Sequence, residues 1–159
     1  MFLKPDYNLK SIYDINLEEL KAKGVNALLF DLDSTLMESK TALYREKTLE
    51  WLNKVQKDFF IGIVSNNTDS NYIEKVKSVT NFPIVFKARK PDIKVAKSFM
   101  ESHNLNGNTT AFIGDRPLTD TICGKRLGCI TILVDSISAD TENPLVRFVR
   151  KLERITIKQ

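Results

Sequence analysis

Short apolar segments recur along the chain at fairly even intervals. They are rich in leucine, aromatic and β-branched residues, and they lack the strict alternation with polar residues that marks a strand with one solvated face. We therefore expect central strands that are buried on both sides of a sheet. The five segments are residues 25–30, 59–64, 84–86, 110–113 and 129–134.

The stretches between these segments have the periodicity of amphipathic helices. Apolar residues three or four positions apart form stripes in residues 48–55 and 71–79, and a third stripe follows Pro91, a residue favoured in the first turn of a helix. Residues 119–127 are a shorter candidate. Because strands and helices alternate, the sequence predicts an α/β fold: a three-layer, Rossmann-like parallel sheet with helices on both faces.

The length of 159 residues points to one domain, residues 1–159. No linker-like stretch or internal repeat divides it. We expect a core of about residues 25–135, an N-terminal arm of residues 1–24, a polar loop over 136–143 and a final helix over about 144–156.

Composition narrows the class of protein. With 42% hydrophobic and 28% charged residues, disordered and disulfide-scaffold classes are excluded. The lone His103 and the cysteines Cys123 and Cys129 lack the paired spacing of a zinc site, so we expect a capping or solvated histidine and two reduced, partly buried thiols. No apolar run approaches the ~20 residues of a membrane span and the N-terminus lacks a secretory signal, so we expect a cytoplasmic protein.

The net charge of +4 is concentrated in the C-terminal segment, where residues 145–159 hold five basic residues and one acidic residue. The rest of the chain is balanced, which disfavours nucleic acid as a partner. In this segment an apolar stripe opposes a basic one, as in helices that lie on anionic membranes. Peripheral contact at the inner membrane face is one interpretation, and packing of the stripe on the sheet is the other. Oligomeric state is not predicted.

Polar and charged side chains follow the apolar segments. The carboxyl ends of parallel strands meet at one rim of a sheet, where ligands bind, so we expect these side chains to converge. Carboxylates without histidine or a ligand cysteine form a hard, oxygen-rich site, which Mg²⁺ prefers. The residues are Asp31 and Asp33 after the first segment, Ser65, Asn66 and Asn67 after the second, Lys90 after the third, and Asp115, Arg116 and Asp120 after the fourth.

With these residues the chain resembles the haloacid dehalogenase superfamily of phosphohydrolases. Four motifs occur in the order of that superfamily, each at a predicted strand end, within residues 25–135: Asp31-Leu32-Asp33-Ser34-Thr35, Ser65, Lys90, and Gly114-Asp115 through Asp120. The resemblance implies a haloacid dehalogenase-type fold and a phosphatase that acts through an aspartyl-phosphate intermediate.

The resemblance also implies the roles of the site residues. Asp31 would be the nucleophile and Asp33 the acid and base, while Ser65 and Lys90 would bind the phosphoryl group. Mg²⁺ would be held by Asp31, the main-chain carbonyl of Asp33, and Asp115. We further expect Asp120 to orient Lys90 or a metal-bound water, Asn66 to contribute to phosphate binding, and Arg116 either to contact substrate or to pair with an acid.

The motif spacing leaves no room for a cap domain. From Asp33 to Ser65 there are 32 positions and from Ser65 to Lys90 there are 25, and each interval must already hold a helix and a strand. The site should therefore be open. An open site suits a bulky substrate that covers the chemistry itself, such as a protein, a nucleic-acid end or a lipid head group.

Over nearly its whole length the chain is similar to the capless class III group, specifically YqeG-type proteins and the phosphatidylglycerophosphate phosphatases related to them. This resemblance implies phosphatidylglycerophosphate as substrate. Family members often carry Asn where Ser34 stands, a departure of little mechanistic weight. The alternatives are a capless phosphatase of a protein, a nucleic-acid end or a small phosphometabolite, and a non-catalytic phosphate-binding module.

Overall fold

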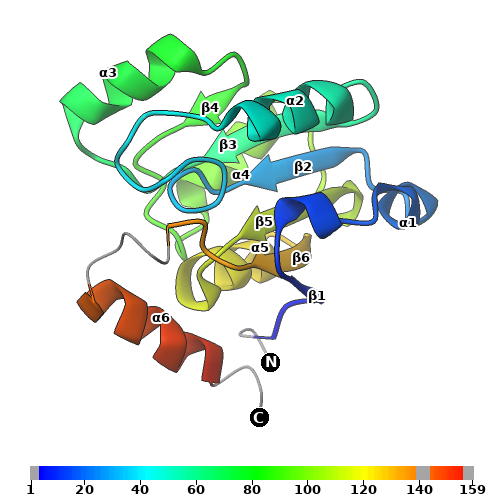
Figure 1. Ribbon diagram of the computed structural model, residues 1–159. Coiled ribbons are helices and arrows are strands. Elements are labelled where there is room, and N and C mark those ends of the chain that lie inside the picture. Colours follow the sequence, from blue (N-terminus) through cyan, green and yellow to red (C-terminus); the bar gives the residue numbers. More distant parts are fainter. Residues whose placement is uncertain (1–3, 139–143, 156–159) are drawn as a thin grey trace.

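The computed structural model describes residues 4–138 and 144–155. Its six strands form one parallel sheet in the order β1-β6-β5-β2-β3-β4 (Figure 1). The structure therefore confirms the predicted α/β class. The strands are β1 (Tyr7–Leu9), β2 (Ala27–Phe30), β3 (Phe60–Val64), β4 (Ile84–Val85), β5 (Thr110–Gly114) and β6 (Ile130–Val134).

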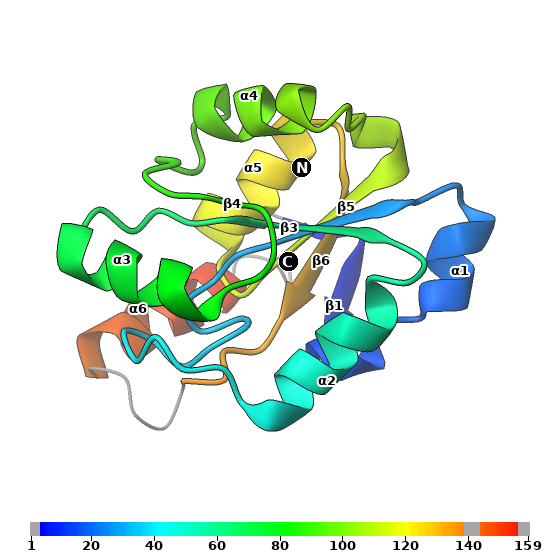
Figure 2. The same ribbon diagram turned by 90° about the horizontal axis from the view of Figure 1, so that it is seen from above.

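Helices cover both faces of the sheet (Figure 2). Successive side chains of a strand point to opposite faces, so Leu28 and Phe30 join one buried cluster and Leu29 joins the other. The first cluster lies under α1 (Leu17–Ala22), α2 (Glu46–Val55) and α3 (Ser70–Val79), and the second under α4 (Lys94–Ser102) and α5 (Ile122–Arg126). The short helical turns η1 (Ile12–Asp14), η2 (Gly107–Thr109) and η3 (Pro117–Thr121) complete this part of the chain.

The N-terminal arm is more than an appendage, because it contributes β1 to the edge of the sheet. This strand pairs in parallel with β6, with Tyr7 opposite Ile132. Asp6 secures the pairing: its Oδ2 accepts the main-chain N–H of Thr131 at 2.8 Å and the hydroxyl of the same residue at 3.1 Å. Burial raises the pKa of Asp6, but the hydrogen bonds from Thr131 and the ion pair with Lys125 outweigh burial and lower it.

The helix predicted over residues 119–127 divides into two elements. A π-helical turn, η3, begins at Pro117, and α5 continues from Ile122. Asp120 donates its main-chain N–H to the carbonyl of Arg116 at 2.8 Å, and its Oδ2 accepts the N–H of Arg116 at 3.1 Å. This wide turn brings the side chain of Asp120 back over the end of β5 instead of leaving it on the helix surface.

The C-terminal helix, α6 (Pro144–Ile155), agrees with the range predicted for it. Residue 156 of that range, and residues 139–143 of the predicted loop before it, lie outside the described residues. Its apolar stripe does not pack on the sheet. Leu145, Phe148 and Leu152 are exposed, whereas Glu153 is buried. No helix in the described part of the chain is both long enough and apolar enough to cross a bilayer.

The histidine and the cysteines have the structural roles expected of them. His103 ends α4, with its Nδ1 2.9 Å from the carbonyl oxygen of Phe99 and its ring against the Phe99 ring. Cys123 and Cys129 are buried and not linked by a disulfide. None of the three lies in the acidic cluster described below.

Candidate active site

The carboxyl ends of the strands carry the residues that the sequence analysis selected. Asp31 follows β2, Ser65 follows β3 and Asp115 follows β5, while Lys90 comes from the segment after β4. The strand β2 lies between β3 and β5. After β2 the chain adds β3 and β4 on one side of it, and then β5 and β6 on the other side. This is the switch point at which α/β sheets bind ligands.

Lys90 is the centre of the site. Its ammonium group is buried and donates to Asp31 Oδ1 at 2.8 Å, to Asp120 Oδ1 at 2.8 Å and to the carbonyl of Val64 at 2.7 Å. Burial alone would lower the pKa of Lys90, but the carboxylates of Asp120 and Asp31 outweigh burial and raise it. The group is therefore a permanent cation between two acids.

Three acids converge beside this cation. Carboxylate oxygens of Asp31, Asp115 and Asp120 lie within 4.8 Å of one another, an arrangement that could hold a metal ion. Thr35 donates its hydroxyl to Asp115 Oδ1 at 3.2 Å, which ties the loop after β2 to the end of β5. Three converging carboxylate groups form an oxygen-rich donor set, which fits a hard divalent cation.

Gly114 allows Asp120 to take this position. A Cβ added at Gly114 would lie 2.3 Å from Asp120 Oδ2 and 2.4 Å from Asp120 Cβ, closer than real atoms approach. Any larger residue there would therefore push Asp120 away from Lys90.

Asp33 has surroundings of its own. Its Oδ1 accepts the main-chain N–H of Lys40 at 3.1 Å and the hydroxyl of Tyr72, while Asn67 Nδ2 lies 3.5 Å from Oδ2. Burial and the Asp33 carboxylate raise the pKa of Tyr72, so this hydroxyl stays protonated and donates. In the sequence Tyr72 is one position of the apolar helical stripe over residues 71–79, and no local signal marks it as a partner of Asp33.

The segment after β3 supports the site through its side chains. The Ser65 hydroxyl is buried and accepts the N–H of Asn67 at 3.1 Å. The Asn66 amide binds the main chain of Lys90 on both sides, accepting its N–H at 2.7 Å and donating to its carbonyl at 3.1 Å. The expected contact of Asn66 with phosphate is through its main-chain N–H, and the side-chain contacts with Lys90 leave this group available for it.

The loop after β2 contains a residue in the left-handed region of backbone conformation. Ser34 has φ of 68°, and its N–H donates to the carbonyl of Met37 at 2.7 Å. Glycine and asparagine adopt this conformation more readily than serine. An asparagine at this position would therefore suit the same loop shape.

Arg116 pairs with an acid, which is one of the two roles expected for it. Its Nη2 donates to Glu153 Oε1 of α6 at 3.0 Å, and Glu153 is almost fully buried. Next to this pair, Arg154 donates to the carbonyl of Asp115 at 3.1 Å. The C-terminal helix therefore contacts the turn that carries Asp115 and Asp120.

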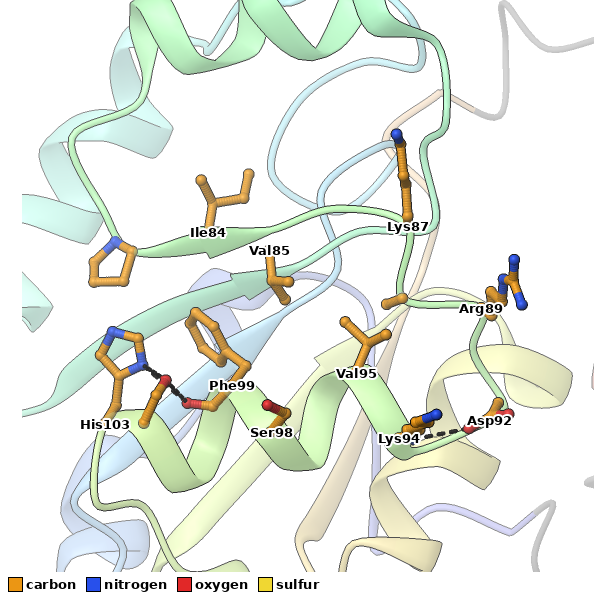
Figure 3. Close-up of a pocket in the computed structure, with 13 residues that line it drawn as sticks. Ile84, Val85, Lys87, Arg89, Asp92, Lys94, Val95, Ser98, Phe99 and His103 are labelled. Atoms are coloured by element: carbon orange, nitrogen blue, oxygen red, sulfur yellow. Dashed lines mark hydrogen bonds between the residues drawn. The ribbon is translucent and has the colours of Figure 1, made fainter.

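Two hollows lie near the rim. One, of about 490 Å³, adjoins Asp33: it is lined by Asn67 and Tyr72, which bind Asp33, and by Lys40 and Lys75. The other, of about 780 Å³, lies between β4 and α4, where Val85, Val95 and Phe99 face it (Figure 3). None of the three clustered acids lines either hollow, but Asn67 and Tyr72 of the first hollow contact Asp33, so the first is the one that adjoins the site.

Comparison with known proteins gives a consistent set of similarities. The family model described as mitochondrial PGP phosphatase matches residues 1–138. "Probable phosphatase YqeG" of Bacillus subtilis (strain 168) is 32% identical over 154 residues, which are 96% of this chain and 88% of that protein.

A second relative is longer. "Phosphatidylglycerophosphate phosphatase 1, chloroplastic/mitochondrial" of Arabidopsis thaliana is 25% identical over 167 residues, covering 99% of this chain and 48% of its own length. The chain thus spans about half of that relative. Among solved structures, an uncharacterized protein from Listeria monocytogenes serotype 4b superposes with a TM-score of 0.57 at 17% identity, covering 80% of this chain and 99% of that one. The last similarity concerns the fold alone.

Proposed function

The chain belongs to the family described as mitochondrial PGP phosphatase and is a phosphatase of the haloacid dehalogenase type, and from this premise we propose that it is a Mg²⁺-dependent phosphatidylglycerophosphate phosphatase. The observation that carries the proposal is the group formed by Asp31, Lys90, Asp115 and Asp120 at the switch point of the sheet. A buried cation beside clustered acids suits a reaction in which charge is moved onto and off a phosphoryl group.

In the proposed reaction Asp31 attacks phosphorus and the bond to the leaving oxygen breaks, which gives an aspartyl-phosphate. Lys90 occupies Oδ1 of Asp31, so we assign the attack to Oδ2. Lys90 also offsets the negative charge of the carboxylate and of the transferred group. The hydroxyl of Ser65 and the main-chain N–H of Asn66 bind phosphoryl oxygens.

Asp33 transfers the protons in both half-reactions. It donates a proton to the leaving oxygen, then removes one from the water that attacks phosphorus and releases Asp31 and inorganic phosphate. Tyr72 and the N–H of Lys40 hold its carboxyl group in place. The carboxylates of Asp31 and Asp115 and the main-chain carbonyl of Asp33 would hold Mg²⁺, which supplies positive charge to the phosphoryl oxygens. Asp120 orients Lys90.

The hollow beside Asp33 supports an anionic leaving group. Once its phosphomonoester is hydrolysed, the product phosphatidylglycerol still carries a phosphodiester. Lys40 and Lys75 line the hollow beside one acid, Asp69, so the lining carries a net positive charge where that group would lie. The site also has no cap, because the intervals between Asp33, Ser65 and Lys90 hold only α2, β3, α3 and β4 with their loops. A lipid head group at the surface of a membrane would cover such a site.

This substrate requires contact with an anionic membrane. We accordingly place the enzyme in the cytoplasm, in peripheral contact with the inner membrane face. The proposed substrate phosphate there belongs to a lipid head group and not to a free metabolite.

The test is phosphate release from vesicles that contain phosphatidylglycerophosphate, with Mg²⁺ and with a chelator, beside a panel of soluble phosphate esters. We expect Mg²⁺-dependent release, abolished by Asp31→Asn and unaffected by Asp58→Asn, an exposed acid that pairs with Lys21 away from the site. Release of phosphate by Asp31→Asn at the wild-type rate would refute the assigned nucleophile.

A second pair of variants tests the leaving-group hollow. Lys75→Gln should raise KM for phosphatidylglycerophosphate about fivefold to tenfold and leave KM for p-nitrophenyl phosphate unchanged, because only the lipid carries a second phosphate. Lys77→Gln, on the same helix but paired with Glu74, is the control. Preference for soluble sugar phosphates over the lipid would contradict the proposed substrate.

A further inference from the structure

The helix α6 turns its apolar residues away from the body of the protein. Leu145 is 67% exposed, Phe148 58% and Leu152 47%. Of the eight large hydrophobic residues that are exposed in the described part of the chain, five belong to this one helix: Leu145, Phe148, Val149, Leu152 and Ile155. At about 100° per residue they fall within an arc of about 120°, so they form one continuous strip.

The opposite side of the helix binds the body through polar side chains. Glu153 is buried against Arg116, and Arg154 donates to the carbonyls of Asp115 and Val134 and to Asp135 Oδ1 at 2.9 Å. This arrangement is the reverse of an ordinary surface helix, whose apolar side faces the core. The helix lies at the carboxyl end of the sheet, on the same side as the site (Figures 1 and 2).

The charges of the helix favour an anionic lipid surface as the partner. Arg147 and Lys151 are exposed beside the apolar strip. The acid of the helix, Glu153, points inward and its charge is matched by Arg116. An exposed apolar strip with exposed cations beside it is the pattern of helices that lie in the interface of anionic bilayers.

The inward side of the same helix contacts the turn of residues 115–121, which carries Asp115 and Asp120 and is called the metal-binding turn below. Arg154 binds the main chain of Asp115, and Glu153 binds Arg116, whose own N–H donates to Asp120 Oδ2. Arg154 of α6 thus contacts Asp115 directly, and its neighbour Glu153 contacts Asp120 through Arg116. A helix of twelve residues is marginal in water by itself and is stabilised where its apolar strip is buried.

Resting on the proposed function, we propose that α6 docks on anionic lipid and that docking orders the metal-binding turn, with Glu153 and Arg154 as positioning residues. Lipid burial of the strip keeps the helix formed and in place. Its inward residues then hold Asp115 and Asp120 in position for Mg²⁺. The enzyme is therefore most active at the surface where its substrate lies.

The experiment uses the full chain, phosphatidylglycerol vesicles that contain no phosphomonoester, and p-nitrophenyl phosphate as a soluble substrate. It measures sedimentation with vesicles and the Mg²⁺ concentration for half-maximal activity. The Mg²⁺-dependent rise in Tm, with and without vesicles, is a second readout that needs no turnover. The result is thus independent of whether phosphatidylglycerophosphate is hydrolysed.

For the wild type we expect sedimentation with phosphatidylglycerol but not phosphatidylcholine vesicles, and a decrease of about fivefold or more in the Mg²⁺ requirement on binding. The double variant Phe148→Glu, Leu152→Glu should keep the vesicle-free rate and lose both effects. Arg154→Gln should bind vesicles at least as well as the control Lys151→Gln does, because Arg154 faces the body of the protein and Lys151 is exposed beside the strip. The Mg²⁺ requirement of Arg154→Gln should nevertheless stay the same when vesicles are added.

Three results would overturn the proposal. The first is a wild type that does not bind phosphatidylglycerol vesicles, or binds them with an unchanged Mg²⁺ requirement. The second is an Arg154→Gln protein that responds to vesicles as Lys151→Gln does. The third is lipid-free self-association of the wild type that the double variant abolishes, which would assign the apolar strip to a second copy of the chain.

Discussion

The side-chain amide of Asn66 binds the peptide groups on both sides of Lys90, accepting its N–H at 2.7 Å and donating to its carbonyl at 3.1 Å. Lys90 reaches Asp31 and Asp120 only because its backbone is held at this depth, next to the end of β3. Asn66 is therefore a positioning residue for the buried cation.

We predict that Asn66→Ala lowers kcat for p-nitrophenyl phosphate by about 10²-fold, because a displacement of about 1 Å at a reacting group costs this much. Asn66→Asp keeps the acceptor for the Lys90 N–H and should retain more activity. Steady-state kinetics with Asn53→Ala, an exposed amide on α2, as control would check this. Equal activity of Asn66→Ala and the control would show that Lys90 needs no such support.

The contact between Tyr72 and Asp33 predicts a dependence on the leaving group. Tyr72→Phe should reduce hydrolysis of an alkyl phosphate by about tenfold and hydrolysis of p-nitrophenyl phosphate much less. The alkoxide must be protonated as it leaves, whereas nitrophenolate need not be. Tyr44→Phe, which removes a hydroxyl bonded to Thr80, is the matched control. An equal loss with both substrates would mean that Tyr72 only stabilises the fold.

Gly114 should be intolerant of any side chain. Gly114→Ala places a methyl group 2.3 Å from Asp120 Oδ2, so we expect a loss of about 1–3 kcal/mol in the free energy of unfolding and loss of activity. Gly24→Ala has open space around its Cβ but φ of 85°, and should cost about 1–2 kcal/mol without affecting kcat. Urea unfolding and kinetics on both variants separate the two effects, and an active Gly114→Ala would show that Asp120 is not needed where it lies.

The buried thiols should be inert near neutral pH. Burial raises the pKa of Cys123 and of Cys129 from 9.0 to about 12, so both stay protonated in the native state. The pKa of each thiol is higher in the folded than in the unfolded protein, so between pH 9 and pH 12 the folded protein binds more protons. The free energy of unfolding should therefore fall as the pH rises from about 9 to about 12. Native protein should resist iodoacetamide at pH 8, and urea should expose two reactive thiols. Fast labelling of the native protein would contradict this.

Much of the fold and the cluster of acids could be predicted from sequence because both depend on local pattern. The apolar segments before Asp31, Ser65 and Asp115 became strands, and parallel strands necessarily deliver their ends to one rim. Lys90 was found by its place in a motif. The geometry that brings it to Asp31 and Asp120 then followed from the strand order.

What could not be predicted depends on long-range contacts. The segment that became β1 has only three residues, and its partner β6 lies more than 120 residues away, so no local pattern distinguishes it from a loop. Tyr72 has the spacing of a core residue, and only the folded loop after β2 brings Asp33 to its hydroxyl. The apolar side of a surface helix usually faces the core, but in α6 it faces away from it. The ion pairs of Glu153 and Arg154 decide which side of this helix faces inward.

The pairing of β1 with β6 also has a consequence for how the polypeptide matures during translation. The strand β1 has no neighbour until residues 130–134 have been synthesised, so the edge of the sheet that β1 forms is completed late. Until then the edge of β5 is open to pairing with other nascent chains. Deletion of residues 4–9 would leave the edge of β6 permanently unpaired in the same way, and aggregation would follow from it.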